Sequence, residues 1–119
     1  MKYFDKVEGT VKRDELFAGV EVAVLTENVS LASGAEFQRG CILAGASGVF
    51  QPVTSSADAS KVLVISAEDV ESDSKVATAY VSGIFNTAKL STGASVVSAA
   101  DFKEPLRQVN ILLADTKQI

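Results

Sequence analysis

The sequence predicts a small, mostly β domain with one short helix near its C-terminus and an extended arm at its N-terminus. Short segments of alternating apolar and polar residues follow one another along most of the chain, and Gly and Ser separate them. Only one segment, close to the C-terminus, spaces its apolar residues as a helix does. A chain of 119 residues fits a single domain, and its 47% hydrophobic and 22% charged residues are typical of a folded protein rather than a disordered one.

The first 16 residues differ from the rest of the chain, because they carry four basic and four acidic side chains among few apolar ones. These apolar residues neither alternate nor form a helical stripe. We expect this segment to be an arm that becomes ordered against a partner, or a frayed terminus. The chain is therefore divided into an arm, residues 1–16, and a β domain, residues 17–119.

The β domain opens with two stretches of alternating residues. Val20, Val22 and Val24 alternate with Glu and Ala, which predicts a half-buried strand. The alternation continues over residues 29–31 and ends at Ser33-Gly34, a typical turn signal.

A hairpin is predicted next. The apolar runs Cys41–Ala44 and Val49–Val53 flank residues 45–48, which form a loop of suitable length. Pro52 has no backbone N–H to donate, so we expect the second strand to lie at the edge of its sheet. Residues 54–60 are small and polar and are expected to form a loop.

The most apolar strand is predicted at residues 61–66, where a β-branched run is long enough to be buried on both faces. An acidic turn with four carboxylates follows at residues 68–74. Clustered carboxylates can bind calcium, but this spacing departs from an EF-hand loop and lacks its glycine. A solvated loop is therefore favoured over a calcium site.

Another alternating strand is predicted at residues 76–85. Val76, Thr78 and Tyr80 share one face, and Ala77, Ala79 and Val81 share the other. Gly83 interrupts the pattern, which indicates a β-bulge or a close approach of two backbones.

The single helix is predicted to begin at Ser98, which has Asp101 at the spacing of an N-terminal capping box. Pro105 requires this helix to be short or to start late, and Asn110 can end it in the left-handed conformation. A final strand is expected at residues 111–114, which gives six or seven strands in all. The apolar residues of the helix that share one face are Phe102, Leu106 and Val109.

The composition excludes most catalytic and metal-binding sites. The chain has no His, so it cannot form a Ser-His-Asp or Cys-His triad, and it lacks the commonest metal ligand. Its single Cys41 excludes an internal disulfide and is expected to be a buried free thiol that packs as a small hydrophobic residue. We therefore expect no enzymatic activity, no cofactor and no metal.

The charge distribution argues against nucleic acid as a partner. The net charge is −4, and residues 17–101 carry four basic against nine acidic side chains, which would repel a phosphate backbone. No apolar stretch is long enough to span a membrane, and charged residues interrupt the N-terminus where a signal peptide would be apolar. We expect a soluble protein that folds in a reducing cytoplasm.

Five segments of the chain, taken in order, carry a family resemblance. They are Leu16–Gly19 leading into Val24–Val29, Ala32–Gly34 with Arg39–Leu43, Leu63–Val70, Thr78–Asn86, and Leu106–Leu112. In this succession they resemble the head decoration proteins of tailed bacteriophages, the group typified by the small capsid-stabilising protein of phage lambda. The resemblance covers residues 16–113 and leaves the first 15 unassigned. Such sequences usually have Gly where this chain has Asn110, which permits the same backbone conformation.

The resemblance implies a β-tulip fold, a small barrel-like domain, and a structural role in the virion. Members of this family form trimers at the three-fold positions of the capsid. By this resemblance the protein is made in the cytoplasm of the bacterial host and binds the outer surface of the expanded head. Its partners are then copies of itself and the major capsid protein, and it stabilises the head against the pressure of packaged DNA.

We expect the arm to make the contact with the capsid. The trimer interface is left unassigned, although the apolar strand residues and the face of Phe102 and Leu106 should divide between it and the core. The residues expected to bind the capsid are Val7, Gly9, Thr10, Val11, Lys12 and Arg13.

Two alternative functions remain open. One is a small soluble β-barrel that binds a ligand, and the other is a different virion component such as a tail or neck protein. A ligand site would need converging polar groups. The polar residues at hand, which have no recognisable site spacing, are Glu68, Asp69, Tyr80 and Asn86.

Overall fold

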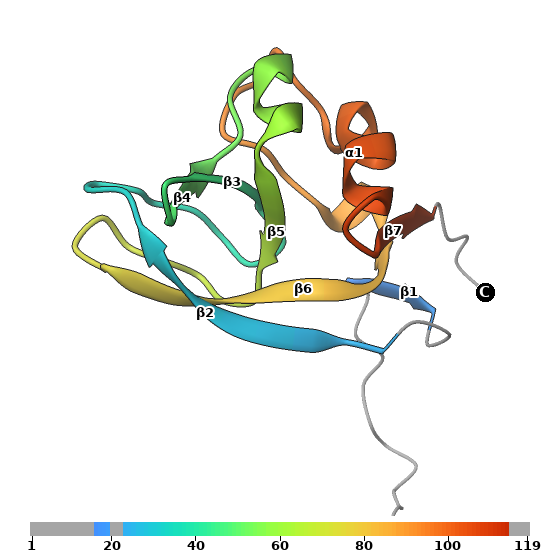
Figure 1. The fold of residues 1–119 in the computed structure, drawn as a ribbon, viewed down its shortest axis with the longest axis horizontal. Helices are drawn as coiled ribbons and strands as arrows, with labels where there is room; N and C mark the ends of the chain where they lie inside the picture. Colours follow the sequence, from blue (N-terminus) through green and yellow to red (C-terminus); the bar gives the residue numbers. More distant parts are fainter. Residues whose placement is uncertain (1–15, 20–22, 115–119) are drawn as a thin grey trace, which may run out of the picture.

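The computed structural model describes residues 16–19 and 23–114, and the described part is mostly β, as predicted. Its helical segments are short and lie on one side of the molecule, opposite the long strands β2 and β6 (Figure 1). The strands are β1 Phe17–Gly19, β2 Leu25–Leu31, β3 Ile42–Ala46, β4 Val49–Pro52, β5 Val62–Ser66, β6 Val76–Asn86 and β7 Ile111–Ala114. The 3-10 helices are η1 Ser56–Ser60, η2 Thr87–Lys89 and η3 Ala99–Phe102, and α1 Lys103–Arg107 is the α-helix.

Five of the strands close into a barrel. Each strand in the order β6, β2, β4, β3, β5 is hydrogen-bonded to the next, and β5 returns to β6 through the pairs Ile65–Tyr80 and Ser66–Ala79. β1 and β7 lie outside this ring. Both pair with the C-terminal half of β6, where Phe85 has Phe17 opposite it on one edge and Leu113 on the other.

The interior of the barrel is filled by apolar side chains from the face of each strand that points inward. Register pairs connect Leu43 to Val64 and Val29 to Ala77, so these residues share one face. The buried members of this cluster are Val29, Leu31, Phe37, Cys41, Leu43, Val64, Val70, Ala77 and Ala79. Ala77 and Ala79 share this face, as the alternation over residues 76–85 predicted, and the structure shows that it is the inward one.

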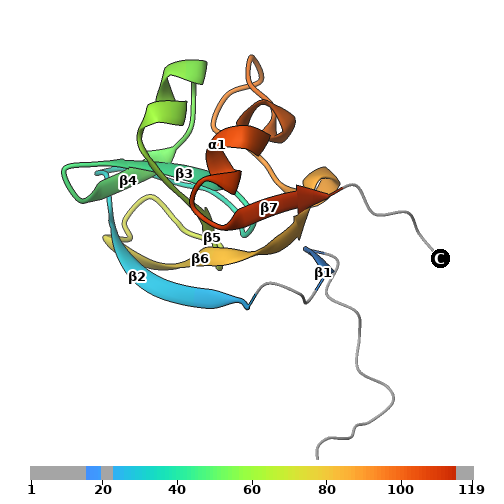
Figure 2. The same ribbon diagram turned by 45° about the vertical axis from the view of Figure 1, so that its right-hand side comes forward.

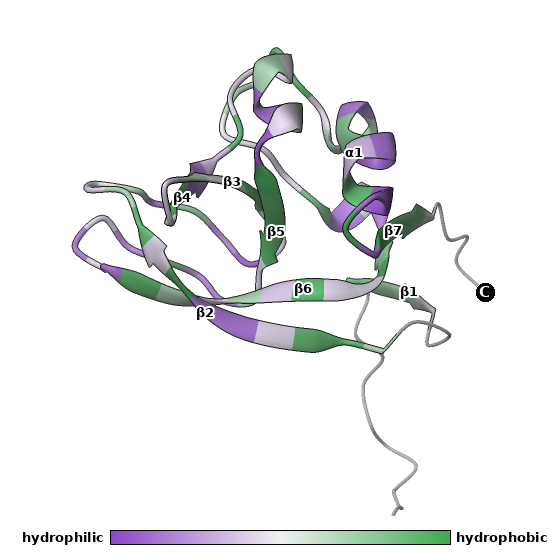
Figure 3. Cartoon of the chain, in the orientation of Figure 1, coloured by the Kyte–Doolittle hydropathy of each residue, from purple (hydrophilic) through white to green (hydrophobic). Residues whose placement is uncertain are grey.

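A second apolar core lies between the outer face of the barrel and the C-terminal segments. Ile42 and Ile65, opposite each other on β3 and β5, point into it. Phe102, Leu106 and Ile111 cover them from η3, α1 and β7 and are almost completely buried. Figure 2 shows these C-terminal elements lying across the barrel strands. β5 contributes to both cores and is hydrophobic along nearly its whole length (Figure 3), as predicted for residues 61–66.

β3 and β4 form the predicted hairpin. The predicted length of its loop and the predicted edge position of its second strand are wrong. Its turn contains two residues rather than four, because Ala46 pairs with Val49 and the connecting Ser47 and Gly48 have φ of 57° and 81°. β4 is not an edge strand, since its first residues also pair with β2. Pro52 is accommodated because the pairing with β2 ends at Phe50, before the missing N–H is needed.

The other turn and helix predictions are largely confirmed. Gly34 lies in a turn with φ of 78°. Gly83 has φ of 143°, and a Cβ placed on it would lie 3.0 Å from the ring of Phe85. Ser98 donates its N–H to Asp101 Oδ2 at 2.9 Å and caps the short helical segment that contains Pro105. Asn110 has φ of 69° and separates α1 from β7.

Two further sequence expectations are wrong, and a third lies mostly outside the described residues. Residues 54–60 are not a simple loop, because residues 56–60 form η1. Val109 does not join Phe102 and Leu106 in the core, because the backbone turns after α1 and leaves this side chain 37% exposed. Of the strand expected over residues 20–24, residues 20–22 lie outside the described part, while Val24 precedes β2 and is 43% exposed.

Candidate functional site

The residues predicted to bind the capsid lie outside the described part of the chain, which begins at Leu16. They are Val7, Gly9, Thr10, Val11, Lys12 and Arg13. The structure does describe the place where the arm joins the domain. This junction begins at Leu16.

Leu16, the last residue of the predicted arm, is held by both its backbone and its side chain. Its carbonyl oxygen accepts a hydrogen bond from the N–H of Asn86 at 2.7 Å. Its side chain is buried, and its Cδ1 atom would lie 3.3 Å from a Cβ placed on Gly40. The chain therefore enters the domain at a fixed point on the C-terminal end of β6.

Phe17, the first residue of β1, packs into an aromatic cluster. Its ring centroid lies 5.2 Å from that of Tyr80 in an edge-to-face arrangement and 5.2 Å from that of Phe85. Tyr80 and Phe85 are themselves 5.5 Å apart. Such ring pairs add stabilisation beyond the burial of their area. Phe17 is only half-buried, so the cluster reaches the surface of the domain.

Arg39, which lies in the turn before β3, covers this aromatic cluster from outside. Its guanidinium carbon lies 5.9 Å from the ring centroid of Phe17 and 5.8 Å from that of Tyr80, within the range of a cation–π interaction. One guanidinium N–H donates to the Tyr80 hydroxyl at 2.9 Å. We call Leu16, Phe17, Arg39 and Tyr80 the arm anchor.

Sequence reasoning did not find the arm anchor, because its members belong to three separate segments of the chain. Arg39 and Tyr80 are 41 residues apart in the chain. Both residues lie in segments that carry the family resemblance, but the resemblance assigned no role to either. One Arg and two aromatic residues are a weak compositional signal in a chain with six Phe and two Tyr. Only the pairing of β1 with β6 brings Phe17 to Tyr80.

The acidic turn after β5 uses its first two carboxylates to bind backbone groups. Glu68 Oε2 accepts a hydrogen bond from the N–H of Thr78 at 2.7 Å, and Asp69 Oδ1 accepts one from the N–H of Arg39 at 2.8 Å. Within residues 16–19 and 23–114, no three side chains of the types that ligate metals are grouped in a way that could hold an ion. The calcium interpretation of this turn therefore gains no support.

Cys41 is a buried free thiol, as predicted, and is 1% exposed. Burial raises the pKa of the Cys41 thiol to about 11, although a hydrogen bond with Ser91 opposes this effect. At neutral pH the sulfur is therefore protonated, and the thiolate that nucleophilic catalysis requires is scarce.

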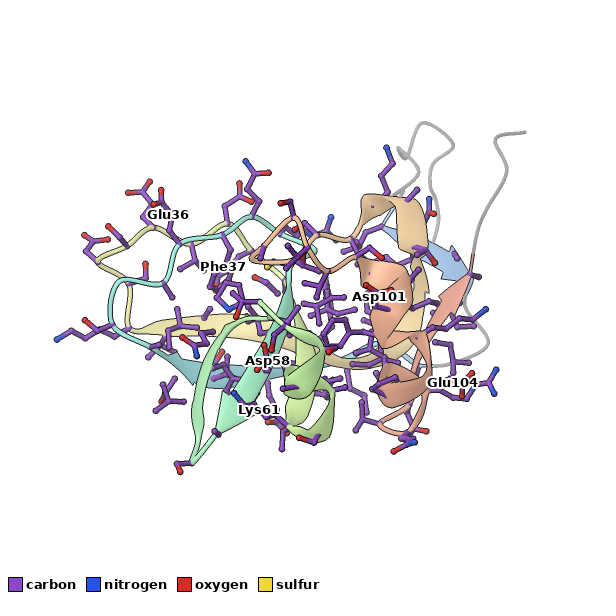
Figure 4. All side chains as sticks on the ribbon, turned by 90° about the horizontal axis from the view of Figure 1, so that it is seen from above. Glu36, Phe37, Asp58, Lys61, Asp101 and Glu104 are labelled. Carbon is purple, nitrogen blue, oxygen red and sulfur yellow. The ribbon has the colours of Figure 1, made fainter. Side chains whose placement is uncertain are left out.

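A buried carboxylate that sequence reasoning missed lies at η1. Asp58 Oδ2 accepts hydrogen bonds from the N–H groups of Thr54 at 2.9 Å and Ser55 at 3.3 Å, and Lys61 Nζ lies 2.9 Å from its other oxygen. Burial alone would raise the pKa of Asp58, but these hydrogen bonds outweigh burial and hold it below its ordinary value. Figure 4 shows Asp58 and Lys61 side by side, away from Asp101 and Glu104. We interpret this pair as a cap of η1.

The four polar residues considered for a ligand site all form hydrogen bonds with other residues of the described part. Tyr80 bonds to Arg39, and Asn86 Oδ1 accepts from the N–H of Ala88 at 3.2 Å. Glu68 and Asp69 bind backbone groups, as described above. Because the barrel interior is packed with apolar side chains, the arrangement favours a structural role over a ligand-binding one.

Comparison with known families decides between the remaining functions. A family profile described as Bacteriophage lambda head decoration protein D matches residues 5–111. The chain belongs to this family. A search among curated proteins found no match. The match begins at residue 5 and therefore includes most of the predicted arm. The resemblance noted in the sequence had left the first 15 residues unassigned.

Membership in the head decoration family establishes the coarse function of the protein. It is a structural component of the phage head, it associates with the capsid and it is located in the virion. None of the helices in the described residues is long and apolar enough to cross a membrane.

Proposed function

We propose that the protein binds the outer surface of the expanded capsid as a homotrimer at three-fold positions and stabilises the head against the pressure of packaged DNA. Its partners are two further copies of itself and the major capsid protein, and it makes no direct contact with nucleic acid. It is synthesised in the cytoplasm of the host bacterium. The observation that carries this proposal is the family match over residues 5–111, which joins the arm and the barrel in one head decoration unit.

The arm is the proposed capsid-binding segment. An extended strand can add to an exposed sheet edge, where its backbone hydrogen bonds supply affinity and alternate side chains fill pockets. Val7, Thr10 and Val11 favour the extended conformation, and Gly9 allows a close approach of two backbones. Lys12 and Arg13 add two positive charges next to this strand. Ordering about ten residues costs on the order of 10 kcal/mol or more, so the arm orders only against its partner.

The domain supports trimer formation through apolar side chains that the core does not use. A closed three-fold assembly joins one face of each subunit to a different face of the next. Phe102 and Leu106, which were expected to divide between core and interface, are both buried in the core. The large hydrophobic residues that remain exposed in the described part are Val24, Leu25, Val49, Val62, Val76, Val96 and Val109. We propose that some of these contribute to the trimer interface.

Stabilisation of the head follows from differential affinity. A trimer that bridges neighbouring capsid subunits buries its full contact area only when the lattice is expanded. Binding then favours the expanded state by the difference in binding free energy between the two states of the lattice. Three arms on one trimer raise the effective concentration of each and compensate for the weakness of a single arm.

The decisive experiment mixes the purified protein with expanded and unexpanded capsids of the phage that encodes it. We expect saturation of expanded capsids at one trimer per three-fold position and little binding to unexpanded ones. Equal binding to both forms, or none, would contradict the proposal. Light scattering during size-exclusion chromatography at high concentration should give the mass of a trimer, and a two-fold dimer would contradict trimer formation.

Deletion of residues 2–15 tests the arm separately. The truncated chain should remain folded with a nearly unchanged thermal midpoint, while its occupancy of expanded capsids falls steeply. Unfolding of the truncated chain would place the arm in the core. Saturation of expanded capsids by the truncated chain would place the binding surface elsewhere.

A further inference from the structure

We propose that the arm anchor fixes the point and direction in which the arm leaves the domain, and that this positioning sets the affinity for the capsid. The inference rests on the proposed function of the arm. Phe17, Tyr80 and Arg39 act as positioning residues in this proposal, which assigns them no contact with the capsid. Their effect reaches the capsid only through residues 1–15.

The backbone pairing at the junction is too limited to hold the chain by itself. β1 contains three residues, has two register pairs with β6, and its register shifts between Phe17 and Gly19. Short strands with few pairs are marginally stable without side-chain packing. The ring of Phe17, which packs against both Tyr80 and Phe85, supplies that packing.

Arg39 is well placed to hold the Phe17 ring because its own turn is rigid. Gly40 donates its N–H to the carbonyl oxygen of Ser66 at 2.9 Å and has φ of 94°, and a Cβ there would lie 2.9 Å from the Lys89 carbonyl oxygen. The N–H of Arg39 bonds to Asp69. The guanidinium thus lies over both rings from a fixed backbone, although the residue as a whole is exposed.

A fixed junction between the arm and the domain should lower the entropy cost of binding the capsid. A fixed exit point gives the arm a defined starting position on the domain, which lowers the entropy that binding must remove. If the junction is released, residues 16–19 become additional residues to be ordered on the capsid. Each backbone residue ordered costs about 1–2 kcal/mol, so releasing even one should weaken binding about tenfold. Three arms on one trimer amplify the loss.

The test uses a matched pair of substitutions, Phe17→Leu and Phe50→Leu. Both remove a half-buried ring from a strand, but Phe50 lies on β4 and packs on the other apolar cluster. Tyr80→Phe removes only the hydroxyl that binds Arg39, and Arg39→Gln removes the charge above the rings. Affinity for expanded capsids is measured for each variant in the full chain and in the chain without residues 2–15. Thermal midpoints confirm that every variant is folded.

We expect Phe17→Leu to lower the affinity of the full chain about tenfold or more, with smaller losses for Tyr80→Phe and Arg39→Gln and little change for Phe50→Leu. In the truncated chain, whose residual binding does not use the arm, Phe17→Leu should have no effect. Equal losses in the full and truncated chains would show a direct capsid contact and overturn the proposal. Equal losses for Phe17→Leu and Phe50→Leu would overturn it as well.

Hydrogen exchange separates failure of this inference from failure of the proposed function. The N–H of Asn86 is bonded to Leu16, so Phe17→Leu should accelerate its exchange while buried amides of β5 keep their protection. Unchanged exchange at Asn86 would overturn the anchor whatever the capsid result. If the unmodified chain fails to bind expanded capsids, the proposed function is wrong, and the exchange at Asn86 still decides whether these side chains hold the junction.

Discussion

The ring of Phe50 lies against the backbone of Gly45 on the neighbouring strand, so closely that a Cβ on Gly45 would be 2.5 Å from two ring carbons. The two residues are opposite each other in the β3–β4 hairpin and share a face. The aromatic ring thereby fills the space that a side chain at Gly45 would occupy in the barrel. A glycine is needed at position 45 because any side chain there would collide with the Phe50 ring, and not because its backbone angles require glycine.

Substitution of Gly45 by Ala should therefore destabilise the domain. The new methyl group must displace the Phe50 ring, and overpacking of this kind costs about 1–3 kcal/mol. Thermal unfolding should show a midpoint several degrees lower. The double variant Gly45→Ala with Phe50→Leu is the control, and the added cost of the Ala should be smaller in it. An equal cost with and without the ring would refute the explanation.

Removal of the Asp58 carboxylate should destabilise the domain at neutral pH. Asp58→Ala loses the cap of η1, and the loss of a helix cap typically costs about 1 kcal/mol. Asp73→Ala, which removes an exposed carboxylate outside this cap, should leave the thermal midpoint nearly unchanged. Chemical denaturation of the two variants at pH 7 provides the comparison, and similar losses in both would contradict the assignment.

The contribution of Asp58 should also depend on pH. Its pKa in the folded protein lies below the ordinary value of 3.8, so the folded state binds the proton less readily than the unfolded state. The stabilisation is present above that ordinary value and is lost as the pH falls through the folded pKa. The difference in midpoint between the unmodified chain and Asp58→Ala should be constant from about pH 5 to 8 and shrink below about pH 4. A difference that persists undiminished at pH 2 would contradict this mechanism.

The residue at position 110 should tolerate Gly better than Ala. Asn110 has φ of 69°, a conformation that costs a residue with a Cβ roughly 1–2 kcal/mol but costs Gly almost nothing. Asn and Asp adopt it more easily than Ala, so Asn110→Ala should lower stability by about 1 kcal/mol. Asn110→Gly should fall within a few tenths of a kcal/mol of the unmodified protein. Chemical denaturation compares the three, and equal stability of the Ala and Gly variants would contradict the proposed role of this backbone angle.

The Cys41 thiol should be unreactive in the folded protein. With a pKa of about 11, about one thiol in a thousand is ionised at pH 8, and the side chain is also buried. Reaction with a disulfide reagent such as DTNB should therefore be slow in buffer and rapid after denaturation in urea. The rate in buffer should follow the fraction of unfolded or locally opened protein. Rapid labelling of the folded chain at pH 7 would show that the thiol is accessible.

The sequence by itself determined the features that depend on neighbouring residues. The apolar run at residues 61–66 could become a buried strand because β-branched side chains favour extended backbone, and alternation placed Ala77 and Ala79 on one face. The capping pair Ser98 and Asp101 and the turn at Asn110 are likewise local, since each involves residues at most a few positions apart. The succession of such segments also pointed to the head decoration family.

Only the tertiary structure decided which of these segments became neighbours. Strand patterns do not specify partners, so the parallel pairing of β4 with β2 could not be foreseen, and Pro52 was wrongly taken to mark an edge strand. The arm anchor also depends on which strands pair with each other. Phe17, Arg39 and Tyr80 meet because β1 pairs with β6 and the turn before β3 folds over them. Contacts between distant segments form when the barrel closes. The local periodicity of the sequence does not specify which strands pair when this happens.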